Sequence, residues 1–356
     1  MKRLLVEDLE HILKHTQSLW DEVRGKRIFI TGGTGFFGKW LLESFIYINE
    51  VLKLESSITV LSRNPEKFLA EFPFYAEYKN VSFLKGNVID FEFPKEQYHF
   101  IIHAATEVDV KLNTEEPLLM LDTITKGTRR VLDFAKEQQV ESFLLTSSGA
   151  VYGKQPYNVT HIKETDSFFI DINNPHSAYA EGKRLAELYC SIYNKQFGIP
   201  VKIARCFAFV GPYLPLDSHF AVGNFIKDVL NGGPLIIKGD GNSYRSYLYT
   251  SDLMVWLWTI LFKGVQNRPY NVGSSSDMKI SEIASRVASL SGERLEIKLS
   301  NENKYLLETN RYIPSVDRAQ KELGLVQSVD LNDAISRTLL WNKSIRQNST
   351  ESRKLI

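Results

Sequence analysis

The sequence predicts an α/β protein in which a doubly wound parallel sheet carries helices on both faces. From residue 25 onward, short apolar runs alternate with stretches of helical periodicity, which is typical of crossover units and a parallel sheet. The run FLLTSS is apolar at consecutive positions, as expected for a strand buried on both sides. After Cys206 the alternation ends and glycine and proline become frequent, which indicates a smaller, irregular α/β domain in the C-terminal part.

Residues 1–24 are predicted to form one amphipathic helix. Leu5, Leu9 and Ile12 recur at helical spacing, with charged residues between them. We expect this helix to pack on the main domain or on a partner subunit, because a helix that lies on a membrane surface would need more lysine and arginine.

The rest of the chain is predicted from its alternating pattern. The strands are expected at Arg27–Thr31, Ser57–Leu61, Val81–Lys85, His99–His103, Ser142–Thr146, Val201–Arg205 and Tyr270–Val272. The helices between and after them are expected at Lys39–Leu52, Thr125–Gln138, Ala178–Phe197, Phe220–Leu230 and Ser281–Leu290. The closing NSTESRKLI has no periodicity, so residues 346–356 are expected to be a flexible tail.

Composition excludes several classes of protein. Lys and Arg number 43 and Asp and Glu 42, and this balance argues against a nucleic-acid or anionic-membrane binder. Two cysteines are too few for a disulfide framework or a zinc site, and we expect no metal. Charges interrupt the N-terminal segment and no apolar run has the length of a membrane span, so a cytoplasmic location is expected.

A glycine-rich turn follows the first predicted strand. Gly32, Gly35 and Gly38 form a G-x-x-G-x-x-G pattern that contains Phe36 and Phe37 and opens a helix. Such a turn brings backbone amides and a helix N-terminus up to a pyrophosphate, where a side chain would block the approach. The pattern predicts a Rossmann-like dinucleotide-binding domain over residues 25–205, to which residues 248–272 return.

The second strand bears on the choice of cofactor. An acidic residue usually follows this strand when the cofactor is NAD, but here Ser62 and Arg63 follow it. Arg63 can pair with a 2′-phosphate, so NADP is favoured over NAD. The alternative is that Arg63 is a solvated loop residue and that the acid comes from elsewhere.

A hydroxyl, a phenol and an amine lie further along the chain. Ser148 ends the fifth strand, and Tyr179 and Lys183 stand four residues apart, so they share one face of a helix. A free phenol has a pKa of about 10 and is a poor base at neutral pH, and a nearby ammonium favours its ionised form. The trio predicts proton transfer at a substrate hydroxyl during hydride transfer.

The motifs TGGTGFFG, HAAT, TSSGAVYG and YAEGK together resemble the extended short-chain dehydrogenase/reductase family, within its nucleotide-sugar epimerase and dehydratase group. The resemblance covers about residues 25–340. It implies that Ser148, Tyr179 and Lys183 form a catalytic triad and that the three glycines cradle the pyrophosphate. It also places Asn87 and Val88 near the adenine, and Ala104, Ala105 and Thr106 along the cofactor.

The resemblance extends to residues 206–345, which are expected to bind a nucleotide-diphosphate sugar. It implies that Asn224 and Arg245 contact the diphosphate, with Arg311 as a weaker candidate for a second phosphate arginine. The alternative for Arg245 is a structural ion pair with an acid such as Asp252. The helices Thr125–Gln138 and Ala178–Phe197 resemble those of a four-helix dimer contact, so a homodimer is expected.

Departures from the family pattern narrow the reaction. Related dehydratases and decarboxylases carry carboxylates after the catalytic serine or threonine, whereas this chain has Gly149 and Ala150. A 4-epimerase or 4-keto reductase needs only the triad and the cofactor, and both remain open. The alternatives are a dehydratase or decarboxylase with displaced acid and base, a reductase of a non-sugar ketone, and, least favoured, a non-enzymatic NADP-binding scaffold. Ala208 and Lys126 replace asparagines that are frequent in the family, which suggests a divergent subgroup.

Overall fold

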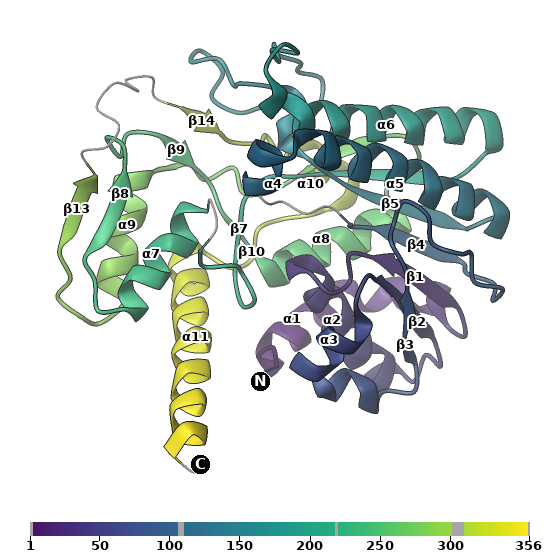
Figure 1. Cartoon of the computed structure of the whole chain (residues 1–356), viewed down its shortest axis with the longest axis horizontal. Coiled ribbons are helices and arrows are strands. Elements are labelled where there is room, and N and C mark those ends of the chain that lie inside the picture. Colours follow the sequence, from purple (N-terminus) through teal and green to yellow (C-terminus); the bar gives the residue numbers. More distant parts are fainter. Residues whose placement is uncertain (1–2, 106–109, 218–219, 301–309, 355–356) are drawn as a thin grey trace.

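The protein is built around a seven-stranded parallel sheet (Figure 1). The computed structural model describes residues 3–105, 110–217, 220–300 and 310–354. The strand order β11-β6-β5-β4-β1-β2-β3 confirms the doubly wound, Rossmann-like class. The strands are β1 Arg27–Thr31, β2 Ser57–Ser62, β3 Val81–Lys85, β4 Phe100–His103, β5 Ser142–Ser148, β6 Val201–Cys206 and β11 Pro269–Val272.

The two faces of the sheet bury alternate residues of each strand. In β1, Ile28 and Ile30 pack into the core on one face and Phe29 into the core on the other. The first face is covered by α2 (Phe36–Leu52) and α8 (Thr250–Lys263), and the second by α5 (Pro117–Gln138) and α6 (Ala178–Phe197). Figure 1 shows α5 and α6 running side by side along the sheet. Shorter helices α3 (Pro65–Glu71) and α4 (Val110–Glu115) complete this part.

The N-terminal segment is two helical pieces rather than one. The α-helix α1 (Val6–Thr16) continues as a 3-10 helix over Gln17–Val23, which turns Trp20 into the core. In α1 the buried Asp8 carboxylate accepts a hydrogen bond from Tyr249 (2.8 Å) and pairs with Arg337 (2.8 Å). These contacts confirm that the segment packs on the main domain.

The C-terminal part forms a smaller lobe with short strands. It contains two small sheets, β8 with β13 and β12-β9-β14, and the helices α7 (Ala221–Leu230) and α9 (Ile280–Leu290). The strands are β8 Leu235–Lys238, β13 Ile297–Ser300, β12 Met278–Lys279, β9 Tyr244–Arg245 and β14 Arg311–Tyr312. The pair β7 (Phe209–Val210) and β10 (Leu248–Tyr249) and the helix α10 (Asp317–Leu323) join the lobe to the sheet domain.

Helix α11 (Leu331–Lys354) differs from the expectation for the last residues. It continues through residues 346–354, for which the sequence predicted no regular structure. Buried side chains such as Ile335 and Trp341 fix the first half of the helix. Main-chain hydrogen bonds extend it into residues 346–354, although these residues have no apolar periodicity. Within the described residues, no helix is long and apolar enough to cross a membrane.

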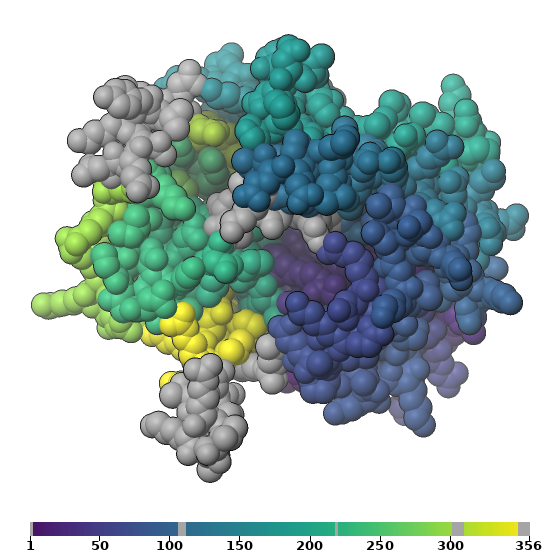
Figure 2. Space-filling view, in the orientation of Figure 1, coloured from purple at the N-terminus to yellow at the C-terminus, as the bar shows by residue number. Residues whose placement is uncertain are grey.

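The two lobes leave a hollow between them. Figure 2 shows this hollow at the centre of the molecule, and its floor has the purple colour of the N-terminal part of the chain. Parallel strands of a doubly wound sheet present their carboxyl ends at one edge, where ligands of such folds bind.

Candidate active site

The glycine loop after β1 is shaped by close backbone approaches. Gly32 has φ +74°, and a Cβ there would lie 2.5 Å from the carbonyl oxygen of Ala104. A Cβ at Gly38 would lie 2.3 Å from the Gly33 Cα, so this glycine lets α2 pack against the turn. Gly35, the N-cap of α2, is exposed, and its nearest contact would be the Gly32 oxygen at 3.4 Å. The helix N-terminus is therefore open to a phosphate group.

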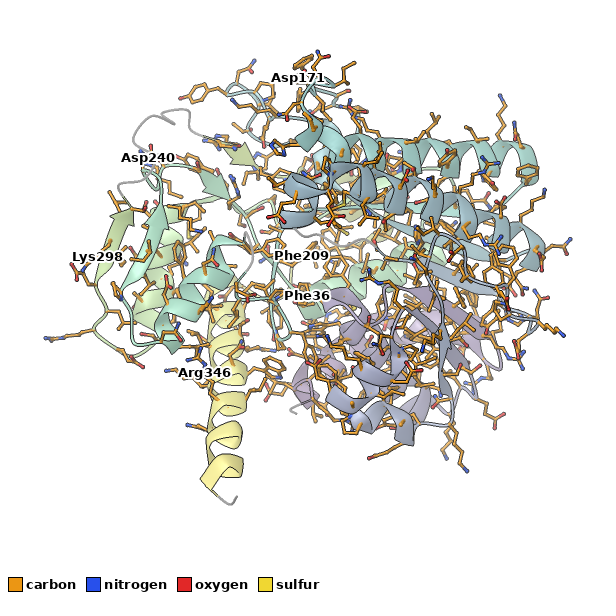
Figure 3. The ribbon with its side chains drawn as sticks, viewed as in Figure 1. Phe36, Asp171, Phe209, Asp240, Lys298 and Arg346 are labelled. Atoms are coloured by element: carbon orange, nitrogen blue, oxygen red, sulfur yellow. The ribbon has the colours of Figure 1, made fainter. Side chains whose placement is uncertain are left out.

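The two phenylalanines of the loop lie between the lobes. The Phe37 ring packs edge-on against Phe209 at 5.2 Å, and the Phe36 ring lies 5.6 Å from Phe37. Figure 3 labels Phe36 and Phe209 close to each other at the centre of the molecule. Both predicted residues thus border the gap between the dinucleotide-binding part and the small lobe.

The end of β2 presents the residues that were predicted to select the cofactor. Ser62 is buried, and its hydroxyl accepts a hydrogen bond from the Asn64 amide (3.3 Å). Arg63 is exposed at the carboxyl edge of the sheet. The Asn64 side chain caps α3 by accepting from the Lys67 amide (2.9 Å), which fixes the turn that carries Arg63.

Residues predicted to line the cofactor sit at the ends of β3 and β4. Val88 packs on Gly127 of α5, where a Cβ would come within 2.9 Å of its methyl group. The Asn87 side chain accepts from the Ile89 amide (3.3 Å). The Ala105 amide donates to the Thr31 hydroxyl (3.2 Å), which sets the backbone of Ala104 and Ala105 over the glycine loop. Thr106 lies outside the described residues.

His103, at the end of β4, stabilises the carboxyl edge of the sheet. The sequence analysis assigned it no catalytic or binding role. Its ring nitrogens bond to the hydroxyls of Thr31 (2.7 Å) and Thr128 (3.0 Å). Burial lowers the pKa of His103 to about 3, and the Lys183 charge acts in the same direction, so the ring is neutral.

Ser148 and Tyr179 meet at the carboxyl end of β5. Tyr179 lies in the first turn of α6. Burial raises the pKa of Tyr179 to about 12, and its interaction with the Ser148 side chain acts in the opposite direction. Ser148 also accepts from the Ala150 amide (3.2 Å), which fixes the position of its oxygen.

Lys183 lies one turn further along α6 and is almost fully buried. Its Nζ donates to the Thr146 carbonyl oxygen of β5 at 2.9 Å. Burial lowers the pKa of Lys183 to about 8. The sequence predicted an ammonium beside the phenol, and the structure adds a backbone acceptor that holds the lysine against β5.

An ion pair behind the triad fixes α6 on the sheet. Arg205 of β6 donates to both oxygens of Glu187 (2.7 Å for the shortest bond), and Glu187 also accepts from the Ser147 hydroxyl (2.5 Å). In the sequence, Arg205 was only the last residue of a predicted strand. Its half-buried, bidentate pair shows a structural role in positioning the helix of Tyr179 and Lys183.

Arg245 reaches the site from β9 of the small lobe. Its guanidinium donates to the carbonyl oxygens of Tyr244 (2.7 Å) and Asn310 (3.3 Å), and burial lowers its pKa. Within the described part of the chain, Arg245 forms no ion pair. The alternative pairing with Asp252 is wrong, because Asp252 pairs with His11 (3.0 Å). A half-buried cation without an acidic partner is suited to bind an anionic ligand.

The other predicted substrate residues are placed differently. Asn224 lies half-buried in α7. Arg311 of β14 pairs with Asp277 (2.8 Å) and stacks on Tyr244, with its guanidinium 3.9 Å from the ring centre. These contacts give Arg311 structural partners, and its role as a phosphate ligand stays a prediction.

Tyr312 is a site residue that the sequence reasoning missed. It pairs with Arg245 in the register of β14 and β9, and its hydroxyl would lie 2.5 Å from a Cβ at Gly149, the residue after Ser148. Successive strand residues point to opposite sides, so Arg311 and Tyr312 face different surroundings. The available signal was the segment NRYIP, which reads as a short strand. In a strand, Tyr312 must point to the side opposite Arg311. No cluster of potential metal ligands is found among the residues that the structure describes.

The fold and this hydroxyl, phenol and amine arrangement define the extended short-chain dehydrogenase/reductase class. A family model described as the NAD dependent epimerase/dehydratase family matches residues 28–273, and the chain belongs to that family. The resemblance inferred from the motifs is thereby confirmed.

Two curated relatives of this chain are UDP-glucuronic acid decarboxylases. UDP-glucuronic acid decarboxylase 1 of Xenopus tropicalis is 29% identical over 318 residues, which are 88% of this chain and 71% of that protein. UDP-glucuronic acid decarboxylase 6 of Arabidopsis thaliana is also 29% identical, over 87% of this chain and 86% of the relative.

Solved structures share the fold at lower identity. An epimerase of Methanothermobacter thermautotrophicus has a TM-score of 0.79 at 23% identity and covers 96% of this chain and 98% of its own. UDP-glucose 4-epimerase of Thermotoga maritima, solved with UDP-glucose, has a TM-score of 0.75 at 20% identity and covers 90% and 99%.

Proposed function

We propose that the protein is a nucleotide-sugar oxidoreductase that acts at the sugar 4-position, either as a 4-epimerase or as a 4-keto reductase. The placement of Tyr179, in the first turn of α6, beside Ser148, at the end of β5, carries this proposal, because the two hydroxyl groups can hold one substrate oxygen between them. Family membership supports the cofactor-dependent chemistry, and the structures of similar fold include enzymes with bound UDP-sugars.

The residues present support removal and return of one proton. The Tyr179 phenolate accepts the proton of the substrate 4-hydroxyl while Ser148 donates a hydrogen bond to the same oxygen. Lys183, four residues along the same helix, favours the phenolate through its charge. A bound nicotinamide dinucleotide supplies the hydride acceptor and donor. The open N-terminus of α2 at Gly35 fits its pyrophosphate.

An epimerase and a reductase differ in the use they make of this proton transfer. In an epimerase, Tyr179 would take the proton of the 4-hydroxyl and return it to the oxygen of the turned-over 4-keto sugar. In a reductase, Tyr179 would donate a proton to a 4-keto substrate once per turnover, with the hydride that a bound dinucleotide would supply. The half-buried Arg245 supports a diphosphate-linked substrate over a steroid-like or flavonoid-like ketone, which carries no phosphate.

Decarboxylation of a nucleotide-linked uronic acid is the second candidate, because the curated relatives are UDP-glucuronic acid decarboxylases. The residues after Ser148 argue against it. Gly149 and Ala150 carry no proton-transfer group, and a Cβ at Gly149 would lie 2.5 Å from the Tyr312 hydroxyl and 2.8 Å from the Phe207 ring. The space of a carboxylate side chain at 149 is therefore filled by aromatic residues.

A panel of UDP-, dTDP-, GDP- and CDP-sugars with NAD(H) and NADP(H) tests the proposal. Mass spectrometry of the products separates the candidates, since decarboxylation removes CO2, reduction adds two hydrogens and epimerisation leaves the mass unchanged. Tyr179→Phe is expected to lower kcat by about 10² to 10⁴-fold with little change in KM. Full turnover by this variant on the true substrate would show that the catalytic assignment is wrong.

A further inference from the structure

The first turn of α6, which carries Tyr179, receives its cap from another helix. The residue that precedes α6 is Ser177, but its hydroxyl donates to the Asp171 carbonyl oxygen (2.6 Å) and does not cap the helix. Instead, the Tyr179 amide donates to the side-chain oxygen of Asn113 in α4 at 3.2 Å. A half-buried asparagine 66 residues away in the sequence therefore accepts from one of the first amides of α6, which have no partner within the helix.

The Asn113 side chain is fixed in one orientation by two hydrogen bonds. Its nitrogen donates to the His176 carbonyl oxygen (2.9 Å), while its oxygen accepts from the Tyr179 amide. An asparagine side chain has one acceptor oxygen and one donor nitrogen, so the flipped orientation would set donor against donor and acceptor against acceptor. Asn113 thus holds the backbone on both sides of the start of α6.

Helix α4 is itself anchored next to this turn. Leu112, the residue before Asn113, packs against the same hydrophobic cluster as Tyr179. Helix α4 also contacts α5 and the short 3-10 helix Pro175–Ser177. In the chain, α4 follows β4, whose carboxyl end is predicted to line the cofactor. Asn113 therefore joins the helix of Tyr179 to the side of the site on which the cofactor is predicted to lie.

We propose that Asn113 is a positioning residue for Tyr179, because it fixes the first turn of α6 and so sets the phenol beside Ser148 at the end of β5. The inference rests on the proposed function in treating Tyr179 as the group that transfers the proton. It deepens that function, because it assigns the placement of the phenol to a side chain outside the triad. Misplacement of a reacting group by about 1 Å can lower a rate by about 10²-fold, so the loss of one cap in this turn is expected to affect turnover.

Amide hydrogen exchange tests this placement without any sugar substrate. In protein loaded with NAD and isotope-labelled at tyrosine, the NMR resonance of the Tyr179 amide is assigned by its loss in Tyr179→Phe. In Asn113→Ala, this amide is expected to exchange faster by roughly 5-fold, the effect of one lost cap. Asn113→Asp keeps an acceptor for the Tyr179 amide, so its exchange is expected to be slower than that of Asn113→Ala.

Turnover tests whether this placement serves the reaction. On a nucleotide sugar that the wild type converts, Asn113→Ala is expected to lower kcat by about 10-fold and to change KM by less than about 2-fold, since the substrate-binding residues of the small lobe are untouched. Asn113→Asp is expected to recover most of the lost kcat. A role confined to stability would lower the melting temperature without this selective loss of kcat.

Asn174→Ala is the matched control. Asn174 also caps a helix in this segment, by accepting from the His176 amide (3.0 Å), but this bond serves the short 3-10 helix and not α6. Its removal is expected to leave kcat and the exchange of the Tyr179 amide near their wild-type values. The proposal is overturned if folded Asn113→Ala exchanges like the wild type, if Asn113→Asp is as impaired as Asn113→Ala, or if the control lowers kcat equally.

The two measurements separate this inference from the proposed function. Faster exchange in Asn113→Ala of a protein that converts no nucleotide sugar rejects the proposed function and keeps the cap. Turnover of a nucleotide sugar by a wild type whose Tyr179 amide exchanges as fast as in Asn113→Ala rejects the inference and keeps the function.

Discussion

At the scale of the residue, Arg63 is predicted to favour NADP over NAD. Its guanidinium is exposed at the carboxyl end of β2, where the 2′-substituent of a bound cofactor lies in this fold. We expect Arg63→Ser to weaken NADP binding by about 10 to 100-fold and NAD binding little, since one charge-assisted contact is lost. Lys67→Ser, an exposed cation on α3, is the control and should change neither affinity. Calorimetric titration measures both, and tighter binding of NAD than NADP by the wild type would contradict this role of Arg63.

Lys183 gives a prediction with a defined pH window. Its pKa is about 8 in the folded chain and that of an ordinary lysine, about 10.5, when unfolded. Between these values the unfolded state binds more protons, so this group's contribution to stability rises with pH. The free energy of unfolding of the wild type minus that of Lys183→Met should therefore increase from pH 8 to pH 10, as urea titrations can show. A difference that is flat or falls over this range contradicts a buried, destabilised ammonium.

The residue scale also shows what the sequence could and could not predict. Ser148, Tyr179 and the glycine loop were found because their spacing is local to one strand end, one helix turn and one tight turn. Tyr312 was missed because it meets Gly149, the residue after Ser148, from a segment far away in the sequence, and only the pairing of β14 with β9 brings it there. The sequence analysis chose the neighbouring Arg311 because of its charge, although Asp277 neutralises that charge in the structure.

At the scale of the element, α1 depends on one buried carboxylate. Asp8 is fully buried between Tyr249 of β10 and Arg337 of α11. Asp8→Ala leaves a cation and a phenol without their partner, and we expect it to lower the free energy of unfolding by about 3 kcal/mol. The matched control is Asp21→Ala, whose exposed carboxylate pairs with Arg24 at 3.5 Å and should cost less than about 0.5 kcal/mol. Urea denaturation measures both, and equal costs would show that the Asp8 network does not anchor α1.

The sequence predicted the boundaries of the strands more accurately than the start of helix α5. The strands of the main sheet lie within a residue or two of their predicted positions, since each is a short apolar run closed by polar or glycine residues. Helix α5 begins at Pro117 rather than Thr125, because its first turn exposes Leu118 and Leu119 and so lacks the periodicity of a packed face. Proline at the first helical position was the available signal.

At the scale of the whole molecule, the exposed face of α6 supports a homodimer. Leu188 and Ile192 are one turn apart on this helix and are 54% and 36% exposed. Apolar residues in such a position are typical of a surface that another subunit covers. Light scattering is expected to show a dimer at micromolar concentration, and Leu188→Asp with Ile192→Asp is expected to give a folded monomer. A monomeric wild type would refute the dimer.

The distribution of charge over the molecule agrees with its near-neutral balance. Anionic ligands do not require a basic surface here, since the helix N-terminus at Gly35 in the sheet domain and the half-buried Arg245 in the small lobe are each suited to bind a phosphate. Sequence reasoning predicted both groups, whereas their relative positions depend on how the small lobe folds back onto the sheet domain.

The contacts of α1 have a consequence for the order in which the chain acquires its structure during synthesis. Trp341 donates a hydrogen bond to the Arg3 carbonyl oxygen (3.0 Å), and Arg337 neutralises Asp8. A ribosome delivers the first of these segments more than three hundred residues before the second. Asp8 therefore lacks its counter-charge until the last helix has emerged, and α1 docks late, after the sheet domain that it covers has been made. The same closeness of Arg3 and Trp341 makes the protein a suitable subject for circular permutation, with a short linker between these segments and new ends opened in an exposed loop.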